Sequence, residues 1–179
     1  MGLNIRQHTY PQKVRVWNTT AVSGTLADTT TETSLDAYPK FDVLDRPFAA
    51  GDTLDLFFAV ILTNNATITM TAAIFWGTQA GTLLVRTGAI ELNDVDSAPH
   101  LIVQAKLVFW SATTVVPSIM ALMGSKATPN YECAAASAVT IAQTANEQPI
   151  SLALDWSGAT VGTAILYQGE AMFSRMPTP

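Results

Sequence analysis

Histidine and cysteine, the side chains most often used as catalytic base and nucleophile, are almost absent from this chain. It contains two histidines, His8 and His100, and one cysteine, Cys133. Nucleophilic catalysis needs a base within hydrogen-bond reach of the nucleophile, and no local motif surrounds any of the three. A dyad of Cys133 and His100 stays open as an alternative, but we interpret Cys133 as a small apolar core residue and both histidines as surface or strand-end residues.

Carboxylates and glycines give no more specific pattern. The aspartates at 42, 45, 52, 55, 94, 96 and 155 form many pairs, and nothing selects one pair for acid–base work. Asn93–Asp96 resembles the opening of a calcium loop but lacks the glycine and closing glutamate, so we interpret it as an Asx-type turn. Gly77–Gly81 lacks the lysine of a phosphate loop and fits a connection between strands. We therefore expect no enzyme activity, no cofactor and no metal.

Charge is scarce. Charged residues make up 13% of the 179 residues, with a net charge of −5, against about 25% in ordinary soluble domains. This deficit predicts that much of the outer surface is covered by neighbouring subunits; the alternative is a neutral surface rich in Thr and Ala. The acidic balance disfavours nucleic acid as a partner. Asn64, Asn65 and Pro117 interrupt the charge-free stretches, which disfavours a membrane span, and the N-terminus has no secretory signal pattern, so we expect synthesis in a cytosol.

The elements that would position these residues are strands, because apolar side chains alternate with period two. The alternation is clearest in Thr67–Trp76, Leu101–Phe109 and Ile150–Trp156. Weaker strands are predicted at 13–18, 41–44, 54–63, 82–90, 137–143 and 162–174, and a short helical turn could occur at 134–138. We predict an all-β fold, a single jelly-roll-like antiparallel β-sandwich, with Ile74, Val103, Leu107, Leu152 and Leu154 buried.

Leu54–Leu62 departs from this alternation, because Phe57, Ala59 and Ile61 make its second face apolar too. That face either contacts another subunit or is covered by the chain itself. The four tryptophans could stack on sugar rings, but three of them end core-type strands, and we interpret them as aromatic plugs at the ends of the sandwich.

Residues 1–35 are polar, rich in threonine and lightly basic, and we predict an extended N-terminal arm before a body at 36–179. We expect the arm to lie against a neighbouring subunit or another protein of the same assembly, with Lys13–Asn18 added as a strand to an exposed sheet edge; the alternative is an arm folded back on its own body. The predicted interface residues are Ile5, Arg6, Tyr10, Lys13, Arg15, Trp17, Phe57 and Ile61.

Residues 22–35 resemble a pattern of tailed-phage particle proteins, a Gly-Thr-Leu entry followed by a Thr-rich stretch and Glu-Thr-Ser. Phe48–Leu54 is similar to the Gly-Asp strand entry of these proteins, and Trp156–Ser157 to their closing Trp-Ser. The resemblance implies a jelly-roll module, often trimeric, that serves as a capsid decoration (cement) protein or as part of a tail or fibre. Since nothing before the body could form a shaft, we predict a homotrimer that decorates the capsid exterior and bridges subunits of the major capsid protein. The alternative is a receptor-binding or fibre module that recognises a host glycan.

Overall fold

The period-two alternation is realised as strands throughout the part of the chain that the computed structural model describes. These residues are 13–20, 25–27, 31–64, 68–92, 100–124, 130–158 and 162–175. The strands are β1 (Lys13–Thr19), β2 (Leu26–Ala27), β3 (Thr33–Ser34), β4 (Lys40–Phe41), β5 (Thr53–Asn64), β6 (Ile68–Trp76), β7 (Thr82–Arg86), β8 (Ile90–Leu92), β9 (His100–Ser111), β10 (Thr114–Gly124), β11 (Asn130–Ala135), β12 (Val139–Thr140), β13 (Gln148–Trp156) and β14 (Gly162–Ser174). Among the described residues no helix is long and apolar enough to cross a membrane.

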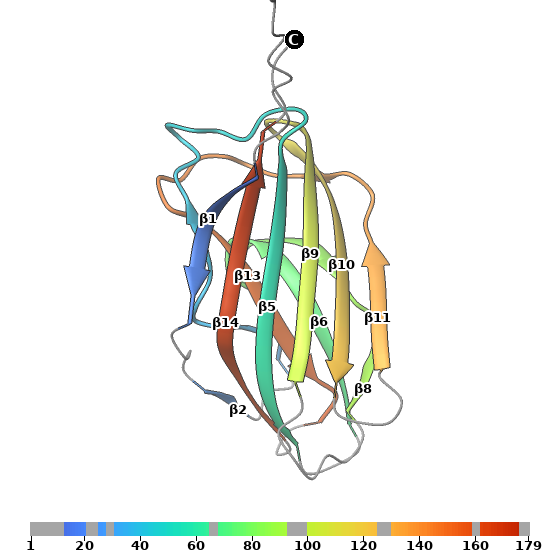
Figure 1. The fold of residues 1–179 in the computed structure, drawn as a ribbon. Coiled ribbons are helices and arrows are strands. Elements are labelled where there is room, and N and C mark those ends of the chain that lie inside the picture. Colours follow the sequence, from blue (N-terminus) through green and yellow to red (C-terminus); the bar gives the residue numbers. More distant parts are fainter. Residues whose placement is uncertain are drawn as a thin grey trace, which may run out of the picture.

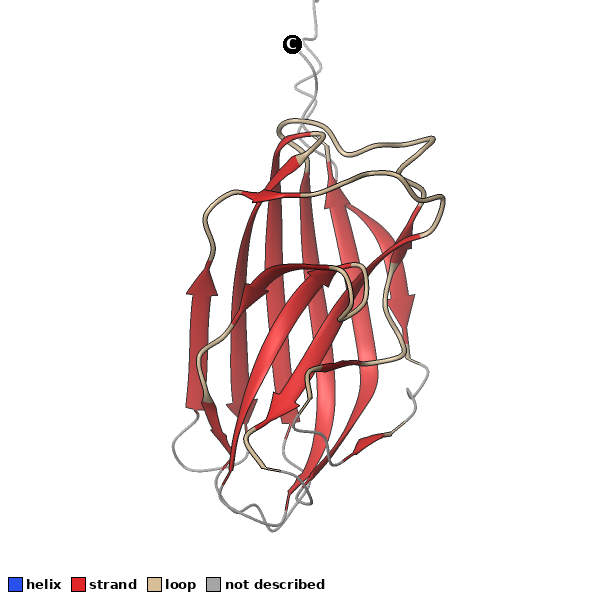
Figure 2. Ribbon diagram, turned by 180° about the vertical axis from the view of Figure 1, so that it is seen from behind, coloured by secondary structure: helices blue, strands red, loops and turns tan. Residues whose placement is uncertain are grey.

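The strands form two antiparallel sheets that pack face to face (Figures 1 and 2). The large sheet has the order β1-β14-β5-β9-β10-β11, with β2 beside β14 and β12 beside β10. The small sheet has the order β3-β13-β6-β7, with β4 beside β13 and β8 beside β6. The predicted all-β antiparallel sandwich is thereby confirmed.

The core lies between the sheets, where alternate residues of the long strands meet. All five residues predicted as core are buried: the exposed fraction is 0% for Ile74, Val103, Leu107 and Leu154 and 1% for Leu152. An aromatic group closes one end, with the rings of Phe48 and Phe109 stacked 4.2 Å apart. The Trp76 indole donates a hydrogen bond to the Ala142 carbonyl (2.8 Å) at the same end, as an aromatic plug should.

The predicted arm enters both sheets wherever the structure describes it. β1 pairs with β14 of the same chain, β2 also pairs with β14, and β3 pairs with β13. A register shift between Arg15 and Trp17 turns the Trp17 indole inward, where it packs against Phe58 with ring centroids 6.0 Å apart. The expected addition of Lys13–Asn18 to a neighbour is therefore replaced by the alternative, a strand folded onto its own body. Ile5, Arg6 and Tyr10 lie outside the described residues.

The short helical turn considered at 134–138 is wrong. Asn130–Ala135 forms strand β11, in register with Ser118–Met123 of β10. Backbone pairing with β10 satisfies these amides, whereas a single isolated turn would leave most of them to solvent.

Candidate binding face of the large sheet

The side chains best suited to catalysis do not come together in the fold. Cys133 is exposed on β11, so its interpretation as an apolar core residue is wrong. His100 begins β9 opposite Gly124, whereas Cys133 lies opposite Met120. Four residues of β10 separate those two positions, which is about 13 Å along a strand, so His100 and Cys133 form no dyad. His8 and the calcium-like segment Asn93–Asp96 lie outside the described residues. Within the described ranges no group of three or more His, Cys, Asp or Glu side chains could hold a metal ion.

The Gly77–Gly81 segment is the strand connection that the sequence predicts. The Gly81 amide donates to the Thr78 carbonyl (2.8 Å), and Gly77 has a φ of 112°. A φ in this region favours glycine, because it has no Cβ. The segment joins β6 to β7 and carries no lysine for a phosphate.

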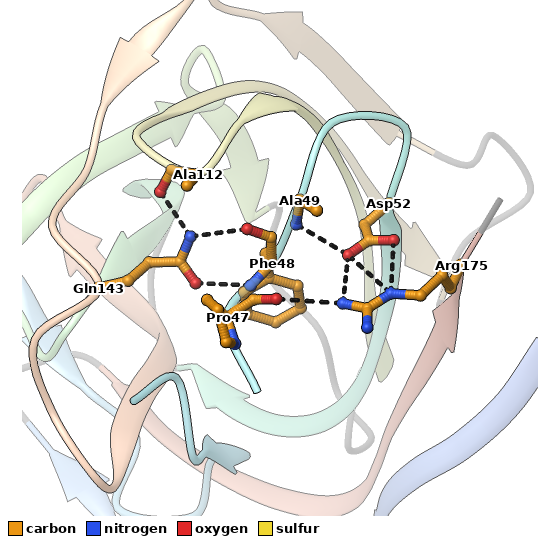
Figure 3. Close-up of polar contacts among 7 residues, drawn as sticks. All are labelled: Pro47, Phe48, Ala49, Asp52, Ala112, Gln143 and Arg175. Carbon is orange, nitrogen blue, oxygen red and sulfur yellow. Dashed lines mark hydrogen bonds and ion pairs between the residues drawn. The ribbon is translucent and has the colours of Figure 1, made fainter. Parts of the chain in front are cut away.

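A polar cluster at one end of the sandwich has a structural role (Figure 3). Arg175 donates to both carboxylate oxygens of Asp52 (3.1 and 2.8 Å) and to the Pro47 carbonyl (3.0 Å). The Gln143 amide bridges the loops, accepting from the Phe48 amide (2.6 Å) and donating to the Phe48 carbonyl (3.0 Å) and to the Ala112 carbonyl. These side chains satisfy one another, so the cluster fastens loops and leaves little capacity for a ligand.

The outer face of the large sheet, in contrast, is hollowed. No other described element crosses this face (Figure 1). A depression of about 870 Å³, here called the trough, runs across all six main strands from β1 to β11. Its outward side chains are Lys13, Asp55, Phe57, Gln104, Lys106, Ser118, Met120, Cys133, Ala135, Glu170 and Met172. Leu56, Ala105 and Ile119 point into the core, so they contribute backbone to its floor.

The trough follows two transverse rows of the antiparallel register. In one row Asp55 lies opposite Met172 and Lys106, and Lys106 lies opposite Ser118. In the next row Phe57 lies opposite Glu170 and Gln104, and Gln104 lies opposite Met120. Residues opposite each other have Cβ atoms about 4.5–5.5 Å apart, so each row forms a continuous line of side chains across the sheet. Short side chains at Ser118, Cys133 and Ala135 hollow the end near β11.

The trough combines apolar contact surface with polar groups that converge on it. Met120 is 37% exposed, and Phe57 and Met172 are half-buried, so all three offer apolar surface. Gln104 and Lys106 are exposed and offer hydrogen bonds. Two ion pairs lie at the β1 end, Lys13 Nζ to Asp55 Oδ2 at 2.7 Å and Arg15 Nε to Glu170 Oε1 at 3.0 Å. This mixture is the usual composition of ligand sites in proteins.

Beside the trough the same face carries an apolar band, formed by Ile61, Ile102, Leu122 and Ile165. All four side chains are half-buried. Ala59, between Gln168 and Ile102 in the register, is only 2% exposed because larger neighbours flank it. The doubly apolar character of Leu54–Leu62 thus arises from a strand whose second face lies on the outside of the sandwich.

The interface residues predicted from sequence divide between these features. Lys13 and Phe57 line the trough, Arg15 holds Glu170 at its rim, and Ile61 belongs to the apolar band. Trp17 faces the core side of the large sheet instead. The sequence prediction missed Gln104, Lys106, Ser118, Met120, Glu170 and Met172. The sequence held a signal for the first two, because Gln104 and Lys106 are polar residues at the outward-facing positions of the predicted strand Leu101–Phe109.

Comparisons with known proteins give fold likeness only. No family model matches the chain, and no curated protein matches its sequence. Among solved structures, the CBM2 module of the evolved Dit protein of Lactobacillus casei BL23 phage J-1 is 8% identical, with 94% of this chain and 99% of that chain covered and a TM-score of 0.41. A legume lectin-like domain from Entamoeba histolytica is 9% identical over 89% of this chain and 82% of that chain, with a TM-score of 0.28. A chain of infectious bursal disease virus strain Gt is 15% identical over 100% of this chain and 45% of that chain, with a TM-score of 0.29.

Proposed function

We propose that this protein is a glycan-binding module of a phage particle, with its ligand lying across the trough of the large sheet. The observation that carries this proposal is the trough itself: about 870 Å³ of open volume over a sheet face that no other described element crosses. Ligand sites generally measure roughly 300–1,000 Å³ and combine apolar walls with a few polar groups. The location on a particle is supported by the resemblance of residues 22–35 to tailed-phage particle proteins.

The shape of the trough suits an extended ligand. It crosses six adjacent strands, and with about 4.8 Å between neighbouring strands its length is roughly 24 Å. An oligosaccharide presents apolar ring faces and many hydroxyl groups along such a length. Phe57, Met120 and Met172 can contact the ring faces, while Gln104, Ser118 and Lys106 can bond the hydroxyls.

Trp110 is the other place where a sugar could stack. It is 66% exposed near the turn between β9 and β10, outside the trough, whereas Trp76 and Trp156 are 4% and 3% exposed. Trp110 does not line the trough, which gathers several apolar and polar side chains on one face. Trp110 therefore serves as the control position for the trough.

Binding to an oligosaccharide array tests the proposal. The wild type should bind a defined subset of glycans. Gln104→Ala and Met120→Ala should each weaken that binding roughly three- to tenfold, since each removes one hydrogen-bonding or apolar contact. Both side chains are exposed, so the melting temperature should change little. Trp110→Ala should bind as the wild type does; loss of binding in Trp110→Ala alone, or no glycan bound by the wild type, would contradict the proposal.

Capsid decoration is the second candidate function, and the apolar band favours it. Ile61, Ile102, Leu122 and Ile165 form a surface suited to contact with protein, such as a coat subunit or another copy in the predicted homotrimer. Counting copies in purified particles separates the two functions. A decoration protein should be present at roughly the copy number of the coat protein, and a glycan-binding module at far fewer copies. Sedimentation of the purified protein tests the homotrimer.

A further inference from the structure

We propose that the trough selects acidic glycans, with the Lys106 ammonium binding a carboxylate or another anionic group of the sugar chain. This inference rests on the proposed glycan-binding function and adds the class of ligand. It follows from the charges that face the trough and from which of them are already neutralised.

The two carboxylates of the trough each have a cation of their own. Asp55 accepts from Lys13 Nζ at 2.7 Å, and its side chain is 28% exposed. Glu170 accepts from Arg15 Nε at 3.0 Å, and its side chain is 20% exposed. Both cations come from β1, so the pairs lie at one end of the trough and leave little uncompensated negative charge in it.

Lys106 is the charged side chain of the trough that neither of these two ion pairs neutralises. It projects from β9 in the middle of the large sheet, is exposed, and has no ion pair or hydrogen bond among the described residues. Its cross-strand neighbour Asp55 is already paired with Lys13. The cations Lys13, Arg15 and Lys106 therefore exceed the anions Asp55 and Glu170 by one, in a protein whose net charge is −5. A local reversal of sign attracts an anion to a hollow that an acidic protein would otherwise repel.

Neutral hydrogen-bonding groups flank this ammonium. Ser118 lies opposite Lys106 on β10, and Gln104 lies two residues away on the same face of β9. A carboxylate has more lone pairs than one ammonium fills, so neighbouring donors complete its coordination. The Ser118 hydroxyl and the Gln104 amide can supply them. The apolar surface of Phe57 and Met120 in the adjoining row then contacts the ring that carries the charge.

The test uses matched pairs of array glycans that share a backbone and differ in charge: uronic oligosaccharides with their methyl esters, and sialylated oligosaccharides with their asialo forms. The wild type should bind the best acidic member at least about tenfold more tightly than its neutral partner, as a charge-assisted bond would provide. Lys106→Gln should lower that preference to about twofold or less without weakening the neutral partner. Lys106→Arg should retain most of it. Lys40→Gln, which removes an equal charge outside the trough, should leave it unchanged.

The outcomes separate this inference from the function on which it rests. Equal affinity for acidic and neutral members, weakened in both by Met120→Ala, would overturn the acidic preference and keep the glycan site. An acidic preference that survives Lys106→Gln would overturn the role of Lys106. Failure of the wild type to bind any glycan would overturn the proposed function itself.

Discussion

Asp155 and Thr71 lie opposite each other on the outer side of the small sheet, and both are poorly satisfied. Asp155 Oδ1 and Thr71 Oγ1 are shielded from solvent and have no hydrogen-bond partner. Close by, Arg86 and Glu32 form a bidentate ion pair, in which Arg86 Nε donates to Glu32 Oε1 at 3.0 Å. Burial and then the Glu32 carboxylate raise the pKa of Asp155, and Arg86 opposes them. A carboxylate in this place therefore destabilises the fold when it is charged.

This arrangement predicts how stability depends on pH. The folded pKa of Asp155 exceeds its ordinary value of 3.8. At pH values between the two, Asp155 is protonated in the folded state and ionised in the unfolded chain. The destabilisation is absent below the unfolded pKa and grows as pH rises through that interval. Asp155→Asn should therefore melt at a higher temperature than the wild type at about pH 7, with a smaller difference at about pH 3.5.

Asp45→Asn is the matched control, since Asp45 is exposed in a turn and should shift the melting temperature little at either pH. Thermal unfolding of all three proteins at both pH values makes the measurement. A difference between Asp155→Asn and the wild type that is equal at the two pH values would contradict the account of Asp155.

Arg175 offers a second prediction at the scale of single residues. The Asp52 side chain that it holds is 2% exposed, so without Arg175 a buried carboxylate keeps, among the described residues, only the Ala49 amide as donor, at 2.9 Å. Arg175→Ala should lower the free energy of unfolding by about 1–3 kcal/mol. Lys40→Ala breaks a pair whose side chains are 51% and 72% exposed, and its effect should stay below about 1 kcal/mol. Denaturant unfolding that gave equal losses would show that the Asp52 cluster adds nothing beyond a surface pair.

At the scale of elements, β1 adds one close side-chain contact to its ladder with β14, at Trp17 and Gly169. A Cβ built on Gly169 of β14 would lie 2.1 Å from the Trp17 ring, so only glycine fits beneath the indole.

Both edges of the large sheet are unsuited to adding strands. The register shift bends β1. On β11, Glu132 points inward toward Gly88, and an inward-pointing charge disfavours the addition of another strand. Partners are therefore expected at the face of the sheet.

Gly169→Ala should displace Trp17 and loosen β1. We expect a loss of about 1–3 kcal/mol in the free energy of unfolding and faster hydrogen exchange of the amides of β1 and β14. Gly124→Ala is the control, because a Cβ there meets only the His100 carbonyl, at 4.0 Å. Unchanged exchange in β1 of Gly169→Ala would mean that the Trp17 contact does not hold the strand.

The sequence predicts some elements well and others poorly, for a physical reason. Thr67–Trp76 was predicted and Ile68–Trp76 is observed, because polar and apolar residues alternate across a face that is partly solvated. β10 was missed because Val116, Met120 and Leu122 make its outer face apolar as well, which hides the period. Proline is rare inside a sheet, yet Pro117 lies within β10. Its absent N–H falls in the gap between β11, which pairs from Ser118 onward, and β12, which pairs up to Val115, so no ladder bond is lost.

The same reason explains how much of the site could be predicted. Lys13 and Phe57 were named from sequence, and the outward phase of β9 identifies Gln104 and Lys106. Ser118, Met120, Cys133 and Ala135 come from β10 and β11, strands that the sequence pattern did not reveal. The trough depends on register across six strands, and register between distant strands is not encoded in any local pattern.

At the scale of the whole molecule, the path of the described chain decides which face is free. Lys13 and Ser174 are register partners, so the described chain enters and leaves the large sheet at the same end, beside the Asp52–Arg175 cluster (Figure 1). The trough occupies the broad face beside that end. A protein anchored by that end could therefore present the trough to a ligand without first rearranging.

Mapping a bound glycan on the protein by amide NMR tests the central claim most directly. With the tightest array ligand added to labelled protein, we predict that the largest shifts fall on 55–57, 104–106, 118–120 and 170–172, four of the segments that line the trough. Amides around Trp110 and Leu44, both exposed outside it, should stay in place. Shifts centred on Trp110 or on the small sheet, with these trough segments unmoved, would contradict the claim that the trough is the binding site.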